Sequence, residues 1–298
     1  MPFEGVDPWR WQYFAARVPE RVIVPIDDAA AYRLHPKERW VYNKLLIAES
    51  QGLCAGPHGM TPPGFPVFSK PIMNMRGMGT GGRVLRGPRD YVGHQQPGHF
   101  WMPLLTGAHA STDVAVERGR PVWWRTTIGH PRRGGTFDYW HVLARRETAL
   151  ERRCRAWIGR HLPEYTGVMN FETIGGRIIE VHLRMADQFA DLNGPGWVEA
   201  VVRLYATGRW RFRDARREAF SVVLFGPHGP RYRIDRRHLA PLLAEPEIAS
   251  VQITFDPSKA PAEHAMPPGG FRLAIVNCWS LEAGRRARRQ LRRLFVEA

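Results

Sequence analysis

The sequence predicts an α+β fold, and three observations favour this class. Residues 165–184 alternate like two strands joined by a tight turn at Gly175-Gly176, since glycine reaches positive φ at no steric cost. Residues 65–85 are typical of a strand, a glycine-rich loop and a second strand. Residues 146–162 and 196–207 have the apolar spacing of helices. Hairpins together with separate helices are typical of the α+β class.

Composition and length limit the kind of protein. A chain of 298 residues can form one large domain or two lobes with a buried core. No apolar run approaches the roughly 20 residues that span a bilayer, and the first residues do not have the pattern of a signal peptide. The three cysteines lie far apart, so we expect neither a disulfide framework nor a paired-cysteine metal site. These features predict a cytoplasmic protein.

The net charge of +15 does not by itself predict a nucleic-acid partner. Only four of the 43 basic residues are lysine, which indicates a coding bias along the whole chain. A helix predicted from Leu281 onward carries six arginines, which we interpret as a solvated face, with RNA or an acidic partner as the alternative. These arginines are Arg285, Arg286, Arg288, Arg289, Arg292 and Arg293.

The first 52 residues predict a short strand and helical segments. Residues 1–20 are aromatic and irregular, and residues 22–26 are an apolar strand. Asp27-Asp28 then opens a helix or a turn. Pro36 suits the start of a second helix, which carries Lys44 and ends at Gly52.

Lys70 lies on the strand predicted over 67–73, on one face with Phe68 and Ile72. A lysine between apolar neighbours is costly to bury without an anion. The alternative is an edge strand, favoured by Pro71, on which Lys70 reaches water.

The loop after this strand contains Gly77, Gly79, Gly81 and Gly82. It is not a Walker A loop, because no Gly-Lys-Ser/Thr follows, and no helix follows directly as a dinucleotide fold requires. A kinase is excluded because neither HRD nor DFG occurs. What remains is a flap between two strands, whose backbone N–H groups can point together at phosphates.

The rest of the chain predicts further strands and a separate C-terminal lobe. Residues 99–105 and 110–128 are strand-like, with a turn at Gly119, and residues 129–138 form a basic, glycine-rich loop that could close over a site. After a basic linker at 208–217, a small α/β lobe is predicted. Its strands are expected at 219–225, 250–255 and 271–278, and its helices at 236–243 and from 281.

The 165–184 hairpin places polar side chains on one face. Val168, Asn170 and Glu172 alternate on the first strand, and Ile178, Glu180, His182 and Arg184 share a face of the second. Such a cluster is costly to bury unless a cation neutralises it, and a divalent cation held by Glu180 and Asn170 is one candidate. A solvated edge hairpin is the alternative.

Between about residues 36 and 190 the order of features resembles the ATP-grasp superfamily. A helix lysine, Lys44, precedes a strand lysine, Lys70, in FSKP, and a glycine flap follows. The segment WMPLLTGAHASTDVAV is similar to the one that passes the adenine. EVHLR, residues 180–184, resembles the Glu-x-Asn-x-Arg strand of that family, with Asn170 on the strand before it.

The resemblance implies two α+β lobes that hold a nucleotide between them, plus a small C-terminal α/β lobe. It divides the chain into an N-terminal segment (1–35), an ATP-grasp domain (36–210) and the C-terminal lobe (211–298). It also implies roles for individual residues. Lys44 and Lys70 would contact the ATP phosphates, residues 77–82 would cover them, and Arg184 with Lys70 would stabilise the transferring phosphoryl group. The implied adenine contacts are Met102, Leu104 and Leu105, and the implied Mg²⁺ or Mn²⁺ ligands are Glu180, Asn170, His182 and Glu172.

The implied activity is a ligase that joins a small-molecule or peptide carboxylate to an amine or other nucleophile through an acyl phosphate and releases ADP. The sequence departs from the family at His182, where a metal-binding Asn is usual, and at Pro103 and His109, where acidic residues often meet adenine and ribose. A nucleotide-binding protein without ligase turnover therefore stays an alternative, and an RNA-binding module is a third.

Only about 35 residues precede the segment that resembles the ATP-grasp family, fewer than a full substrate domain. Either the C-terminal lobe and the 129–138 loop recognise the substrate, or a partner protein supplies the missing part. An oligomer is compatible with the sequence.

Overall fold

The structure is a computed structural model that describes residues 3–4, 17, 19, 21–75 and 77–297. Much of the aromatic stretch predicted over residues 1–20, with Trp9, Trp11, Tyr13 and Phe14, lies outside the described residues. No helix in the described part of the chain is both long and apolar enough to cross a membrane.

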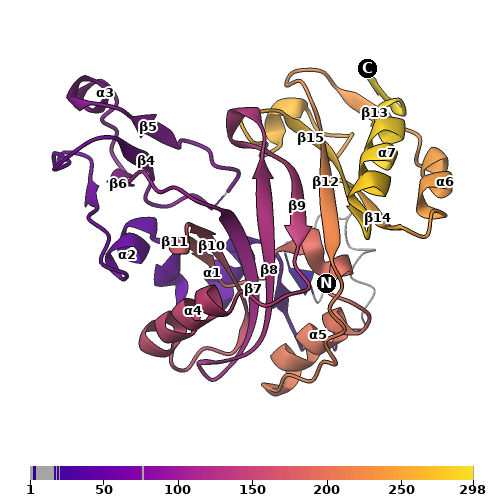
Figure 1. Cartoon of the computed structure of the whole chain (residues 1–298), viewed down its shortest axis with the longest axis horizontal. Helices are drawn as coiled ribbons and strands as arrows, with labels where there is room; N and C mark the ends of the chain where they lie inside the picture. The colour runs from indigo at the N-terminus through magenta and orange to yellow at the C-terminus, as the bar shows by residue number, and fades with distance from the viewer. Residues whose placement is uncertain (1–2, 5–16, 18, 20, 76, 298) are drawn as a thin grey trace.

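An antiparallel sheet of eight strands forms the centre of the molecule (Figure 1). The strand order is β11-β10-β7-β8-β9-β12-β15-β14. In chain order the strands are β7 (His109–Glu117), β8 (Arg120–Pro131), β9 (Phe137–Val142), β10 (Gly167–Ile174), β11 (Arg177–His182), β12 (Ala219–Gly226), β14 (Ile248–Ile253) and β15 (Phe271–Cys278). The strands predicted at the C-terminal end therefore join the same sheet as the central hairpin.

Helices cover both faces of this sheet. On one face lie α4 (Thr148–His161) and α7 (Leu281–Arg292), which bury the apolar side chains of β10 and β12 that alternate with polar ones. The other face is covered by η4 (Asp187–Leu192) and α5 (Trp197–Thr207). The alternation on β10 places Phe171 in the α4 core and leaves Asn170 and Glu172 on the opposite face.

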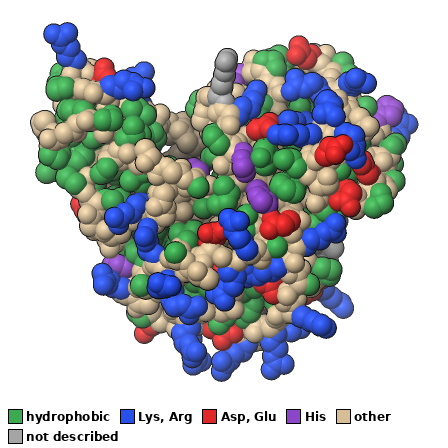
Figure 2. Space-filling view, in the orientation of Figure 1, with side chains coloured by type: hydrophobic (Ala, Val, Ile, Leu, Met, Phe, Trp, Pro, Cys, Tyr) green, Lys and Arg blue, Asp and Glu red, His purple; other side chains and the backbone are tan. Residues whose placement is uncertain are grey.

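A second sheet, of four strands, forms a small lobe beside the eight-stranded sheet. Its strand order is β3-β6-β4-β5, and a short helix, α3 (Pro88–Val92), follows β5. The strands are β3 (Gly56–Pro57), β4 (Val67–Pro71), β5 (Arg83–Leu85) and β6 (His99–Pro103). Figure 2 shows the surface hollowed between this lobe and the rest of the molecule.

The N-terminal elements lead up to the small lobe, and the last two of them contact β11, the edge strand of the large sheet. They are β1 (Phe3–Glu4), which pairs with β2 (Val24–Pro25), then α1 (Asp28–Leu34), η2 (Arg39–Tyr42) and α2 (Lys44–Glu49). The single helix predicted from Pro36 to Gly52 is wrong. Asn43 interrupts it with an extended backbone, and its side chain accepts a hydrogen bond from Leu46 N (3.1 Å), because asparagine favours a cap over a helix interior.

The loop predicted over 129–138 is also wrong in extent. Strand β8 continues to Pro131 and β9 begins at Phe137, so only residues 132–136 connect them, including η3 (Arg133–Gly135). Strand β9 was not predicted at all. It pairs with β8 on one side and β12 on the other, and this pairing joins the two halves of the sheet.

The C-terminal lobe contains three predicted strands and two further short ones. Strands β13 (Tyr232–Ile234) and β16 (Phe295–Glu297) pair with each other, and η6 spans Pro261–Glu263. The helix expected over 236–243 is η5 (Arg236–Leu239) followed by one turn, α6 (Ala240–Leu243). On α7, Arg285 and Arg288 form ion pairs with Asp138, and Arg286 contacts Glu245 and Glu282. The division at residues 35 and 210 stays a prediction.

Candidate active site

Strands β10 and β11 bring the predicted polar side chains together. Asn170 pairs with His182 and Glu172 pairs with Glu180 across the antiparallel ladder, so all four lie on one face of the hairpin. The ladder then shifts by one residue, and Thr173 pairs with Ile178. Ile178 therefore packs in the α4 core, and the prediction that it shares the polar face is wrong.

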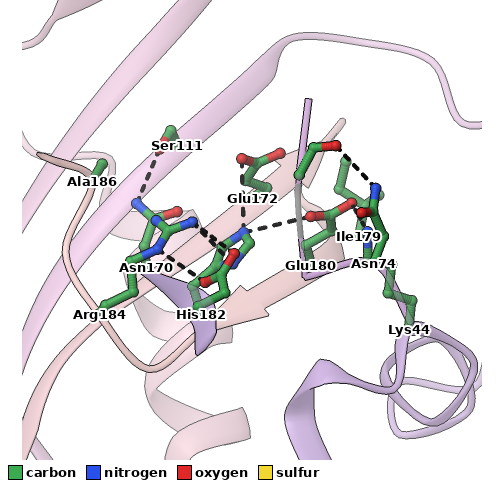
Figure 3. Close-up of polar contacts among 12 residues, drawn as sticks. Lys44, Asn74, Ser111, Asn170, Glu172, Ile179, Glu180, His182, Arg184 and Ala186 are labelled. Atoms are coloured by element: carbon green, nitrogen blue, oxygen red, sulfur yellow. Dashed lines mark hydrogen bonds and ion pairs between the residues drawn. The ribbon is translucent and has the colours of Figure 1, made fainter. Parts of the chain in front are cut away.

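Glu172, Glu180 and His182 form a group that could hold a metal ion, and Figure 3 shows their side chains turned toward one another. One ligand atom from each lies within 4.8 Å of the others. His182 Nε2 is 3.5 Å from Glu180 Oε2 and 3.9 Å from Glu172 Oε1. This nitrogen is buried and has no hydrogen-bond partner among the described residues. Two carboxylates and a free imidazole nitrogen suit a divalent cation such as Mg²⁺ or Mn²⁺.

Asn170 lies beside this group on the same face of the hairpin, and its role as a metal ligand stays a prediction. Its Nδ2 donates to Ser111 Oγ (3.0 Å) and to Asp113 Oδ1 (2.8 Å) on β7. Asp113 also accepts from Ala186 N (2.9 Å), and burial raises the pKa of its carboxyl to about 7 against these two hydrogen bonds. Asn170 therefore anchors the hairpin to β7 and to the loop after β11.

His109 lies on the other side of Glu172. Its Nε2 is 3.4 Å from Glu172 Oε2, and its ring packs edge-on against Phe137 and Trp140. Burial raises the pKa of Glu172, but the neighbouring His109, His182 and Arg184 outweigh it and hold this pKa below its usual range. The carboxylate is therefore ionised at neutral pH, as a metal ligand must be.

Asp28 contacts two of the predicted site residues. Asp28 Oδ1 accepts from His182 Nδ1 (2.9 Å) and forms an ion pair with Arg184 Nε (2.9 Å), and Oδ2 accepts from an Arg184 terminal nitrogen (3.1 Å). Burial raises the pKa of the Asp28 carboxyl, but the charges and hydrogen bonds of Arg184 and His182 hold it well below its usual range. The sequence showed Asp28 only as the start of a helix.

The two predicted phosphate lysines lie at the same face. Lys44 Nζ is 2.6 Å from Glu180 Oε1, and Lys70 Nζ donates to the backbone oxygen of Ile179 (2.8 Å). Both side chains are buried. At Lys70 the edge-strand alternative is wrong, because β4 lies between β6 and β5 and the side chain does not reach water. Burial lowers the pKa of Lys70 to about 8, assisted by the charge of Lys44 and opposed by those of Glu180 and Glu172.

The glycine loop connects β4 to β5, as predicted. Gly77, Gly79 and Gly81 have φ between +63° and +79°, the left-handed region that favours glycine. The carbonyl of Gly77 accepts from Asn74 Nδ2 (2.9 Å), which fixes the start of the loop. At Gly82 a Cβ would lie 2.9 Å from the Phe68 ring, so a side chain there would disturb β4.

The three predicted adenine contacts differ in their surroundings. Met102 and Leu105 belong to an apolar cluster with Phe68, Phe100 and Ile179, which joins the small lobe to β11. Leu104 is 37% exposed and lies outside the described members of this cluster. Their contact with a nucleotide stays a prediction for all three.

We expect the Lys44→Ala variant to bind Mn²⁺ more tightly than the wild type in the absence of nucleotide, on the order of tenfold. The Lys44 ammonium contacts a Glu180 oxygen that a metal would use, and its charge repels a cation. Titration followed by electron paramagnetic resonance measures the affinity, with the exposed Lys37→Ala as the matched control. Weaker Mn²⁺ binding by Lys44→Ala would contradict this competition.

Comparison with known proteins identifies the architecture. No protein-family model matches the sequence, and no curated protein does either. Among solved structures, an L-amino acid ligase from Bacillus licheniformis is similar over 91% of this chain and 77% of its own, with a TM-score of 0.61 and 14% identity. N5-carboxyaminoimidazole ribonucleotide synthetase from Thermus thermophilus is similar over 92% and 82%, with a TM-score of 0.61 and 15% identity.

Carboxyaminoimidazole ribonucleotide synthase from Aspergillus clavatus, solved in complex with ATP, is similar over 91% of this chain and 81% of its own. Its TM-score is 0.59 and its identity is 14%. These similarities extend over about nine tenths of this chain. The chain has the ATP-grasp fold.

Proposed function

We propose that this protein is an ATP- and metal-dependent ligase that joins a carboxylate to an amine or another nucleophile and releases ADP. The observation that carries the proposal is the meeting of two buried lysines with Glu172, Glu180 and His182. Similar structures include an L-amino acid ligase and ribonucleotide synthetases, one of them complexed with ATP. A fold shared with these enzymes supports the reaction class but does not name the substrate.

Each residue has a proposed role that follows from its chemistry. Lys44 and Lys70 would bind the nucleotide phosphates, and the glycine loop would cover them with backbone N–H groups. Glu172, Glu180 and His182 would hold Mg²⁺ or Mn²⁺, and the side-chain oxygen of Asn170 is proposed as a further ligand. Arg184, held by Asp28, would stabilise negative charge on the transferring phosphoryl group. ATP, when bound, would activate the carboxylate as an acyl phosphate.

A nucleotide-binding protein without turnover is the second candidate, favoured by one contact. Lys44 and Glu180 bind each other directly, so phosphate and metal must each displace one partner of this pair. The deciding experiment measures ADP release in the presence of ATP, Mg²⁺ and pools of amino acids, peptides and metabolites. Binding of ATP with no release from any pool would favour the second candidate, and absence of ATP binding would contradict both.

The acceptor and the carboxylate are proposed to bind near the end of β11 and the loop after it. That loop continues into η4, which contacts β12, β14 and β15 of the C-terminal lobe. The connection at 132–136 is too short for the long covering loop that the sequence predicted. A partner protein that completes the substrate site stays part of the proposal.

We expect the affinity for a non-hydrolysable ATP analogue to fall as the pH rises through about 8. Burial lowers the pKa of Lys70 to about 8, so the ammonium that binds phosphate loses its proton there, whereas an exposed lysine stays charged to about pH 10. The expected loss between pH 7 and 9 is on the order of tenfold. Isothermal titration measures it, with Lys70→Ala as the control that should respond much less. Identical pH profiles for both proteins would contradict this assignment.

A further inference from the structure

Asp28 reaches the proposed site from outside the segment that resembles the ATP-grasp family. It is the first residue of α1, next to the N-cap Asp27, whose Oδ1 accepts from Ala30 N (2.6 Å). Asp27 is exposed and caps the helix, whereas the Asp28 side chain is 6% exposed and turns toward β11. Two neighbouring aspartates thus do different things, and only the second contacts His182 and Arg184.

The contact with His182 decides which ring nitrogen faces the metal group. An ionised carboxylate only accepts hydrogen bonds, so the proton of the Asp28–His182 contact belongs to Nδ1. The opposite nitrogen, Nε2, then faces Glu172 and Glu180. The ring of Tyr42 packs edge-on against His182 with the centroids 6.4 Å apart, which restricts the ring further.

The same carboxylate fixes Arg184. Both Asp28 oxygens contact the guanidinium, through Nε at 2.9 Å and a terminal nitrogen at 3.1 Å. Such a two-point contact sets the plane of the guanidinium as well as its place. Asp28 thus contacts His182 and Arg184 on the sides opposite to those that would contact the metal and the phosphate.

We propose that Asp28 is a positioning residue that presents His182 Nε2 to the metal and orients Arg184. The inference rests on the proposed function, because it assumes a metal at Glu172, Glu180 and His182. Carboxylates that hold the far nitrogen of a histidine ligand fix its tautomer and ring orientation, and losing one commonly costs 10–100-fold in metal affinity. Asp28 occupies that place relative to His182.

The test is a double-mutant cycle read by Mn²⁺ affinity, which requires no turnover. Asp28→Asn should weaken Mn²⁺ binding by at least about tenfold. Asp27→Asn is the matched control, because it removes the same charge one residue away and keeps a good helix cap; its Mn²⁺ affinity should equal that of the wild type. In a His182→Asn background, Asp28→Asn should change the affinity less than about twofold, because the effect acts through His182. An equal loss in both backgrounds would overturn the inference.

A second measurement locates the proton on the His182 ring and requires no metal. Nitrogen-15 spectra of histidine-labelled protein, assigned by the signal missing in His182→Asn, should show the proton on Nδ1 of His182 in the wild type and on Nε2 in Asp28→Ala. An unchanged His182 signal in folded Asp28→Ala would overturn the inference. Should Asp28→Ala fail to fold, the cycle with Asp28→Asn decides. Failure of the wild type to bind Mn²⁺ would overturn the metal site of the proposed function, whereas normal Mn²⁺ binding with no ADP release would contradict only the ligase activity.

Discussion

A Glu180→Gln variant is expected to lose ATP turnover by at least about a hundredfold while it still binds the ATP analogue weakly. A metal that stabilises phosphoryl charge contributes several kcal/mol to such a reaction, and about 1.4 kcal/mol corresponds to tenfold in rate. Glutamine keeps the shape of Glu180 but removes the charge that a cation requires. It also leaves Lys44 without its 2.6 Å ionic partner, so the nucleotide phosphates become the nearest compensation for that ammonium.

The measurement is a metal titration with the ATP analogue, together with ADP release. Glu282→Gln on α7 is the matched control, because its side chain is 83% exposed and contacts only Arg286 among the described ion pairs; it should leave both quantities unchanged. His182→Asn provides a second comparison, since it restores the ligand that the family usually has. It should retain metal binding or shift the preference from Mn²⁺ towards Mg²⁺. Metal affinity unchanged in Glu180→Gln would falsify the site.

The elements with strong local signals were predicted well. The hairpin at Gly175-Gly176, the turn at Gly119 and the strand ending at Cys278 all form as the alternation and the glycines indicate. Strand β9 was missed because Gly134 and Gly135 just before it suggested a longer loop, although FDYWHV is rich in strand-forming residues. Its pairing with β12 depends on residues about 80 positions away, which no local pattern encodes.

The site was predicted only in part, because local patterns show which face a side chain lies on but not which distant residues it contacts. Alternation places Glu172, Glu180 and His182 on one face, and the structure brings them together. Alternation does not say which polar group a side chain will contact, so the hydrogen bond from Asn170 to Asp113 was not predicted. Asp113 was overlooked on β7, where the spacing of Ser111 and Asp113 gave a usable signal. No sequence pattern indicated a role for Asp28 in the site, because its partners His182 and Arg184 lie more than 150 residues away.

A Lys70→Ala variant is expected to bind the ATP analogue more weakly by about 1.5–3 kcal/mol, the range for hydrogen bonds to charged groups. Lys70 is buried between the two lobes, and the only bond described for its ammonium is to the backbone oxygen of Ile179. That oxygen carries no full charge, so the ammonium lies near a carboxylate cluster without a direct ionic contact. A phosphate would supply the missing anion, and its binding would also oppose the desolvation that lowers the pKa of Lys70.

Three matched variants separate charge, position and fold in this experiment. Lys70→Met keeps the apolar stem beside the Phe100 ring and removes only the charge, so it should lose as much affinity as Lys70→Ala and keep the melting temperature closer to that of the wild type. Lys44→Ala should lose the same or less, because part of its charge already neutralises Glu180. Lys259→Ala, exposed in the C-terminal lobe, should bind the analogue like the wild type. Equal losses for Lys70, Lys44 and Lys259 would mean that general positive charge attracts the nucleotide, and they would rule out a specific phosphate contact at Lys70.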